Sequence, residues 1–451
     1  MSENTTIDAS AVGSEPRTRK VRGFIRRLAL NRRSLSLVDQ AVVSVTNMGT
    51  SVIVGRTCAK EQLGLYASGL SLILLLTAIQ AALITVPYTI SNPRIPKLEH
   101  PIYKGSTVLQ QICLVFIGML TFLLFGVFGS FHSSGELKSI FLTLAVVSGV
   151  VCFRDFVRRI SYADLRFGFA LLTDCVLAVL QLAAVSFLAW NHQLNARTAL
   201  LATGFAAICG GAMWLVFNWS TISFSLSHAL HGFRVNWTLG RWLFSSSVLW
   251  SLSVDQYPWV ITTLSAPTEA AVWASCFGVM AFLNPIVLAL NNDVAPRVSH
   301  DYARLGLSGL SRSVFRSAGI AAILTSPILA ALLLFGSRLV RLMYGAKYSG
   351  NGVIVSALAV GVWFFAIGLA FPYGMLSLKR PGVDFAINVA CFASFLAVGI
   401  WLIHAHGVYG AACSFLFVES VALALRILAF RRVIATAARH QLTSLRTGAP
   451  A

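Results

Sequence analysis

The stretch LSLILLLTAIQAALITV, from Leu70 to Val86, is an apolar run interrupted by only four polar residues. A strand of a membrane barrel is shorter and alternates apolar with polar residues, and this run does not. A helix that crosses the hydrocarbon core of a bilayer needs about 20 mostly apolar residues. The run therefore predicts a membrane-spanning helix, and it sets the class of the whole chain.

The composition of the full chain points to the same class. Of its 451 residues, 57% are hydrophobic and 11% are charged, whereas charged residues make up about 25% of a typical soluble domain. So few charges cannot cover a water-facing surface with polar groups. We therefore predict an all-α polytopic membrane protein whose main solvent is lipid.

Apolar segments of spanning length recur along the whole chain, and they predict about 12 transmembrane helices. Their expected limits are 35–56, 63–90, 105–131, 137–157, 167–190, 197–218, 238–263, 269–291, 313–335, 351–376, 382–404 and 408–430. An even number of spans returns the chain to the side from which it started.

The positions of the basic residues predict the orientation in the membrane. With the N-terminus in the cytoplasm, 28 of the 35 Lys and Arg residues fall on the cytoplasmic side. This is the positive-inside pattern of membrane proteins. It accounts for the net charge of +19 without nucleic acid, and it predicts that both termini are cytoplasmic. The outer side keeps seven residues: Arg56, Lys60, Lys138, Arg197, Arg338, Arg341 and Lys347.

The longest non-apolar stretch between spans divides the chain into two six-helix halves. We predict a basic cytoplasmic tail at 1–33, an N-lobe at 34–218, a cytoplasmic linker at 219–237, a C-lobe at 238–433 and a cytoplasmic tail at 434–451. The other connections are short, so no soluble catalytic domain fits between the spans.

The triplet Val-Asp-Gln occurs in the first predicted helix of each half, at Val38–Gln40 and at Val254–Gln256. This match favours two parallel six-helix repeats related by an axis along the membrane normal, an arrangement known in transporters. A carboxylate that faces lipid at a helix centre costs about 2.5–3.5 kcal/mol. We therefore expect Asp39 and Asp255, with Gln40 and Gln256, to point between the halves. There they line a translocation path or link helices by hydrogen bonds.

Further polar residues are candidates for a pathway. Asn47 is polar within the first predicted span, and Arg56 ends that span at a predicted outer vestibule. Asp174 has no charged residue three or four positions away, so it needs a partner from another helix or from water. Glu419 precedes Arg426 by two helical turns, which predicts a structural pair.

Motifs of enzymes and of nucleotide or metal binding are absent from the sequence. There is no G-x-S-x-G, no H-E-x-x-H and no P-loop. His404 and His406 in LIHAHG are predicted to be surface residues. The sequence predicts no enzymatic activity, no cofactor and no metal site.

Three segments carry a resemblance to a known family. Ser36–Leu75 has a first helix with Gln and Asn, then a short loop and Gly64-Leu65-Tyr66. Leu334–Gly350 has Phe-Gly followed by spaced tyrosines, and Gly407–Val433 opens with Gly-x-x-Gly-Ala-Ala. Together they resemble the Wzx-type polysaccharide and oligosaccharide-lipid flippases of the polysaccharide transport family. That family belongs to the multidrug/oligosaccharidyl-lipid/polysaccharide (MOP) superfamily.

The resemblance implies a fold and a function. It implies two six-helix lobes in a V around a central cavity, as in MATE and other MOP transporters, in a bacterial inner membrane. It implies alternating-access movement of an undecaprenyl-diphosphate-linked oligosaccharide, a precursor of exopolysaccharide or O-antigen, to the outer leaflet. Expected partners are this lipid-linked glycan, membrane lipid and the polymerase and glycosyltransferase machinery. The diphosphate needs Arg or Lys, for which helix-end residues such as Arg56, Arg154 and Arg241 are available.

Two other functions stay open at this point. A MATE-like cation-coupled multidrug or small-solute antiporter would use Asp39, Asp174 and Asp255 as ion sites. A polytopic glycan ligase would need a large outer loop with catalytic Arg or His. Because the predicted outer connections are short, the ligase ranks last.

Overall fold

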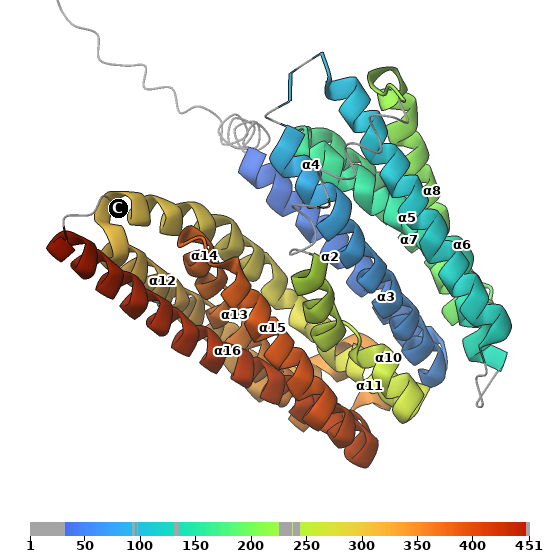
Figure 1. Ribbon diagram of the computed structural model, residues 1–451. Coiled ribbons are helices and arrows are strands. Elements are labelled where there is room, and N and C mark those ends of the chain that lie inside the picture. Colours follow the sequence, from blue (N-terminus) through green and yellow to red (C-terminus); the bar gives the residue numbers. More distant parts are fainter. Residues whose placement is uncertain are drawn as a thin grey trace, which may run out of the picture.

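A computed structural model describes residues 32–92, 95–96, 98–129, 135–224, 237 and 244–447. All the regular secondary structure in these ranges is helical. The predicted tail at 1–33 lies almost entirely outside the described residues, as does most of the predicted linker at 219–237. Figure 1 shows two groups of helices, one coloured blue to green and the other light green to red. These groups are the predicted six-helix lobes.

The N-lobe contains six rods in chain order. The second rod is not uniform, because a π-helical turn separates its two α-helical parts. The elements are α2 (Arg32–Thr57), α3 (Lys60–Gln80), η1 (Ala81–Thr85), α4 (Val86–Ser91), α5 (His100–Phe128), α6 (Gly135–Ala163), α7 (Phe167–Trp190), α8 (Ala196–Asn218) and the 3-10 turn η3 (Trp219–Thr221).

The C-lobe also contains six rods, several of which are interrupted. The elements are an apolar helix at Phe244–Val254, α10 (Tyr257–Leu264), α11 (Pro267–Gly278), η4 (Val279–Leu283), α12 (Asn284–Tyr344), η5 (Ala346–Tyr348), α13 (Gly352–Gly368), α14 (Ala370–Ser377), α15 (Pro381–Ser394), η6 (Phe395–Gly399) and α16 (Ile400–Thr447).

Glycines separate consecutive spans inside the two longest helices. Gly306 in α12 has φ 65° and Gly407 in α16 has φ 55°, a region that glycine occupies without the steric cost of a Cβ atom. In the described part of the chain, nine helices are long and apolar enough to cross a membrane, and shorter apolar helices lie at Phe244–Val254 and Pro267–Leu283. Since the last of the nine holds two predicted spans, the order of helices agrees with twelve crossings.

Prolines mark several interruptions of the helices. The predicted continuous span 238–263 is wrong in this respect, because the helix ends at Val254 and α10 begins at Tyr257. Pro258 lies in the first turn of α10, where its missing N–H costs no helical hydrogen bond. Pro87 and Pro285 lie likewise near the starts of α4 and α12. As a result Asp255 lies at a break between helices, unlike Asp39, which lies within α2.

The two lobes contact each other toward one end of the molecule. We call the end with the start of α2 and the end of α16 the tail side, and the opposite end, with the 57–60 connection and η5, the far side. Among the described residues, the inter-lobe hydrogen bonds extend from the far side to about the middle of α3. They join Ser51 to Tyr344, Arg56 to Leu342 and Met343, Cys58 to Lys347, Ser68 to Pro258 and Thr262, and Ser71 to Gln256.

Close helix packing holds this junction together. Gly64 of α3 lies so near α11 that a Cβ atom there would collide with the carbonyl oxygen of Pro267. The aromatic rings of Tyr257 and Trp273 stack with their centroids 4.5 Å apart, and both are buried in the main hydrophobic cluster. The two lobes therefore share one apolar core on the far side.

Candidate functional site

Four charged side chains meet inside the N-lobe, where α2, α6 and α7 pack together. The guanidinium of Arg158 lies 2.6 Å from Asp39 and 2.7 Å from Asp174. Arg154 forms an ion pair with the other oxygen of Asp174. Asp174 was predicted to need a partner from another helix or from water, and both of these arginines belong to another helix, α6.

Neutral groups complete this cluster. The hydroxyl of Tyr162 donates to Oδ2 of Asp39, and the guanidinium of Arg158 lies 5.4 Å from the centroid of the Tyr162 ring. Nη2 of Arg158 also donates to Oε1 of Gln40 at 3.1 Å. We call Asp39, Gln40, Arg154, Arg158, Tyr162 and Asp174 the N-lobe polar cluster.

The N-lobe polar cluster contains two carboxylates and two guanidiniums, so its charges cancel, and all four groups are largely buried. The side chain of Asp39 is fully buried and that of Asp174 is 1% exposed, while Arg154 and Arg158 are 15% and 16% exposed. Taking ions out of water is expensive, and a buried pair that loses one member leaves an uncompensated charge. The two carboxylates therefore hold the two guanidiniums in place inside the lobe.

The direction of Asp39 corrects the expectation that this carboxylate points between the halves. Its hydrogen-bond partners, Arg158 and Tyr162, belong to α6 of the same lobe. The face of α2 that is directed toward the C-lobe instead contains Ser51 and Gly55, which contact Tyr344. Residues at helical spacing from these share their face.

Closer to the tail side, Met48, Ser44 and Gln40 lie on this same face of α2. Of the two α2 residues in the N-lobe polar cluster, Gln40 thus shares the face of Ser51, whereas Asp39 does not. Arg158 bonds to it directly. Asn47 is exposed. Gln40 therefore connects this face of α2 to Arg158.

The second Val-Asp-Gln triplet has a different environment from the first. Asp255 accepts a hydrogen bond from Ser251 at 2.8 Å, and no ion pair to it occurs among the described residues. Nε2 of Gln256 donates to the carbonyl oxygen of Ser71 at 2.8 Å, across the lobe junction. The triplets therefore mark corresponding helices, but their side chains have different partners.

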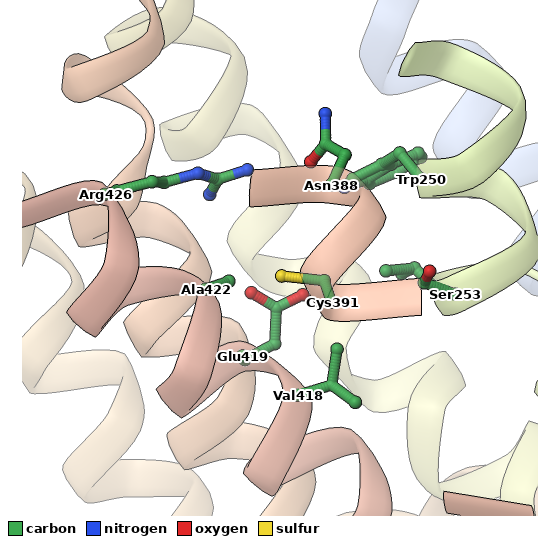
Figure 2. Close-up of a pocket in the computed structure, with 9 residues that line it drawn as sticks. Trp250, Ser253, Asn388, Cys391, Val418, Glu419, Ala422 and Arg426 are labelled. Atoms are coloured by element: carbon green, nitrogen blue, oxygen red, sulfur yellow. The ribbon is translucent and has the colours of Figure 1, made fainter. Parts of the chain in front are cut away.

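A small cavity in the C-lobe contains a third buried carboxylate. Its volume is about 10 Å³, room for about one water molecule, and Trp250, Ser253, Asn388, Cys391, Glu419 and Arg426 are among its lining residues. Figure 2 shows the Glu419 carboxylate between Cys391 and Ala422, and the Arg426 guanidinium directed toward Asn388. The predicted Glu419–Arg426 pair is not formed within ion-pair distance.

The charges around this cavity do not balance. Glu419 is 3% exposed, and no hydrogen bond or ion pair from its side chain is found among the described residues. Asp384 of α15 lies 3.5 Å from Nδ2 of Asn388. Two carboxylates, Asp384 and Glu419, thus accompany the single guanidinium of Arg426. The lining of the cavity itself contains one carboxylate, Glu419, and one guanidinium, Arg426, whereas Asp384 lies beside the lining residue Asn388. Glu419 is thus a buried carboxylate that can take up a proton.

Arg56 lies at the far side, as expected from its place at the end of the first helix. Its Nε donates to the carbonyl oxygen of Met343 at 2.7 Å, and its Nη2 donates to that of Leu342. His404 and His406, also near the far side, are exposed as predicted.

Sequence reasoning did not single out Arg158 and Tyr162 as site residues. It named only Arg154, as a residue at a helix end, whereas Arg154, Arg158 and Arg159 all lie within α6. The available signal was their spacing. Arg154 and Arg158 are four positions apart on one helical face, and Asp174 needed a partner from another helix.

The fold is that of known transporters, although sequence comparisons find no relative. No protein-family model matches the chain, and no curated protein matches it by sequence. The chain is similar to an inward-facing MATE family multidrug transporter of the MOP superfamily, with TM-score 0.72 and 13% identity over 89% of this chain and 98% of that one. It is also similar to the lipid II flippase MurJ in an inward closed conformation, with TM-score 0.68 and 12% identity over 92% and 93%.

An outward-facing structure of a MATE family transporter gives a TM-score of 0.62 at 13% identity, over 89% of this chain and 94% of that one. The inward-facing structure is thus the more similar of the two. In this protein the inter-lobe hydrogen bonds between described residues lie away from the tail side.

Proposed function

We propose that this protein carries a lipid-linked oligosaccharide across a bacterial inner membrane by alternating access. The observation that supports this most is the one-sided junction between the two lobes. Hydrogen bonds between described residues join the lobes only from the far side to about mid-membrane. Separation of the lobes at this junction, together with their closure at the tail side, would expose the seam to each side of the membrane in turn.

The chemistry of an undecaprenyl-diphosphate-linked glycan suits such a seam. The lipid tail stays in the bilayer while the sugar and the diphosphate cross between the lobes. A diphosphate requires guanidinium or ammonium donors. Arg158 provides a guanidinium bonded to Gln40, and Arg154 provides a second one on the shared partner Asp174. We propose that a phosphate near Gln40 competes with Asp39 and Asp174 for these arginines.

The proposed orientation has the tail side in the cytoplasm. It is supported by the excess of Lys and Arg residues at the tail-side ends of the spans. The seven residues assigned to the outer side lie at or near the far-side helix ends. The glycan would then be received from cytoplasmic glycosyltransferases and passed to polymerase machinery in the outer leaflet.

A translocation assay with purified components tests this function. The protein is placed in liposomes with a fluorescent undecaprenyl-diphosphate oligosaccharide, and the fraction that reaches the opposite leaflet is measured by quenching. Wild-type protein is expected to accelerate translocation, Arg158→Gln to abolish it, and Arg159→Gln to preserve it. Arg159 is the matched control because it pairs with Asp155 on the same helix and is 43% exposed. Translocation no faster than in protein-free liposomes contradicts the proposal.

A second candidate function is a cation-coupled antiporter of drugs or small solutes. The C-lobe cavity supports it, because Glu419 is a buried carboxylate with no ion pair or hydrogen bond among the described residues. Such a group can take up a proton or a small cation in one conformation and release it in the other. Ion-gradient-driven efflux of a cationic dye from liposomes, without glycan translocation, would favour this second function.

A further inference from the structure

On the far side, a basic side chain of each lobe donates hydrogen bonds to backbone carbonyls at the end of a helix of the other lobe. Arg56, in the last turn of α2, donates to the carbonyl oxygens of Leu342 and Met343 near the end of α12. Lys347 of η5 donates in return to the carbonyl oxygen of Cys58, just beyond α2. The last carbonyls of a helix have no partner within it and carry partial negative charge. Each lobe therefore caps a helix of the other lobe.

These cations border a hollow in the surface. The hollow has a volume of about 430 Å³ and is lined by Arg56, Tyr344, Gly345, Ala346 and Lys347. A third cation is close by, since the Nζ atoms of Lys60 and Lys347 lie 5.7 Å and 5.5 Å from the centroid of the Tyr348 ring. Three positive side chains thus gather at one point of the junction.

The positive charge at this point is not neutralised by ion pairs. No carboxylate lies within ion-pair distance of Arg56, Lys60 or Lys347 among the described residues. Partial burial lowers the pKa of Lys347 and the neighbouring Lys60 lowers it further, whereas Cys58 and Glu61 oppose the shift. An anion that entered the hollow would relieve this repulsion.

We propose that this far-side hollow binds a phosphate-bearing anion, with Arg56 and Lys347 as its direct ligands. An ionised phosphate oxygen makes a stronger hydrogen bond with a cation than a neutral carbonyl does, and the planar guanidinium can donate to two oxygens at once. The anion therefore replaces the helix-end carbonyls as the partner of both side chains. The hydrogen bonds of Arg56 and Lys347 to the carbonyls of the opposite lobe are then lost, and this loss favours separation of the lobes at the far side.

Two sources can supply such a group. One is the headgroup of a lipid in the far leaflet, and the other is a phosphate or diphosphate in solution. The coupling to lobe separation rests on the proposed alternating-access function, whereas the binding of the anion does not.

Binding is measured by calorimetry on the full-length protein in maltoside micelles, which contain no phosphate. One arm titrates inorganic pyrophosphate and the other a short-chain phosphatidylglycerol. Wild type is expected to bind at least one of them, and the double variant Arg56→Gln/Lys347→Gln to bind it at least tenfold more weakly. Binding of pyrophosphate indicates the soluble source, and binding of phosphatidylglycerol alone indicates the lipid source.

Two control variants test whether the loss of binding is due to Arg56 and Lys347 themselves. Arg338→Gln removes a far-side cation that lies against Phe335 and does not line the hollow, so its binding should equal that of wild type. Arg56→Lys/Lys347→Arg keeps both charges and should keep binding within a few-fold, which separates loss of the ligands from loss of the fold. Equal binding by wild type and the double Gln variant, or no binding of either probe by wild type, overturns the proposal.

The proposed separation of the lobes on anion binding is tested by a distance measurement. Spin labels at Lys138 and His404, exposed far-side positions of the N-lobe and the C-lobe, report the distance between the lobes. The anion should lengthen this distance in wild type and leave it unchanged in the double Gln variant. Anion binding without a change in distance refutes the coupling. Failure of glycan translocation with binding intact would refute the proposed transport function and leave the anion site standing.

Discussion

The guanidinium of Arg158 lies 2.6 Å from the carboxylate of Asp39, although 119 positions separate the two residues in the chain. This contact ties α2 to α6 inside the N-lobe. Asp174 of α7 lies on the other side of the same guanidinium. One arginine therefore holds three helices together, and the stability of this lobe should depend on it.

Replacing Arg158 with Gln should destabilise the protein strongly. The change leaves two buried carboxylates with a single guanidinium, and breaking a buried pair costs about 3–5 kcal/mol. Thermal unfolding in detergent measures the effect. Arg159→Gln is the control, with an expected cost of about 0–1 kcal/mol because its pair with Asp155 lies near the surface. A similar fall in midpoint for both variants would show that the cluster does not stabilise the lobe.

Replacing Asp39 with Asn should slow transport more than it reduces insertion into the membrane. Arg158 keeps Asp174 as a partner, so the fold persists while the balance of charge near Gln40 changes. We expect translocation to fall about tenfold, equivalent to about 1.4 kcal/mol in the rate-limiting barrier. The same change at Asp255 is measured beside it, since its carboxylate has only Ser251 as a hydrogen-bond partner among the described residues. Wild-type rates with normal amounts of both variants would exclude these carboxylates from the path.

Replacing Gly64 with Val should open the far side. The new side chain collides with the Pro267 carbonyl of the other lobe, and backbone atoms cannot move aside cheaply. Spin labels at Lys138 and His404, in a background without the exposed Cys113 and Cys413, should show a longer distance than in the parent protein. Gly319→Val is the matched control, because nothing lies within 4 Å of a Cβ atom at that position. Equal distances in the two variants would mean that the α3–α11 contact does not hold the far side closed.

Replacing Glu419 with Gln should uncouple transport from an ion gradient if the C-lobe cavity takes up the coupling ion. Gln keeps the shape of Glu but cannot release a proton or balance a cation. Flux into liposomes is compared with and without an imposed proton or sodium gradient, and Asp293→Asn, on the exposed part of α12, serves as the control. A gradient response that survives in Glu419→Gln would assign coupling to another group.

The orientation is tested by single cysteines on opposite sides. His404→Cys at the far side should react with a membrane-impermeant thiol reagent in intact spheroplasts. Arg380→Cys, in the tail-side connection before α15, should react only after the membrane is permeabilised. The reverse pattern would invert the proposed topology.

Hydropathy was sufficient to predict the twelve crossings, because lipid requires a long apolar run for each span. Hydropathy did not predict the interruption of the helix at Asp255 and Gln256. There a new helix, α10, begins with Pro258 in its first turn, and the two polar residues lie within an otherwise apolar segment. The conformation of Gly306 and Gly407 was also invisible, since a positive φ is a property of the folded backbone.

The partners of the charged residues depend on helix packing rather than on spacing along the chain. Asp174 could be predicted to need a partner, and it has one. The identity of that partner required the neighbouring positions of α6 and α7. Asp39 turns toward α6 because Arg158 is there, and nothing within α2 reveals this.

The reciprocal capping by Arg56 and Lys347 also has a practical consequence. It creates a surface patch to which both lobes contribute, and this patch exists only while the far side is shut. An antibody fragment raised against it would recognise the arrangement of the lobes in which the far side is closed and hold the protein in it. Such a reagent would supply the rigid complex needed to image a small membrane protein.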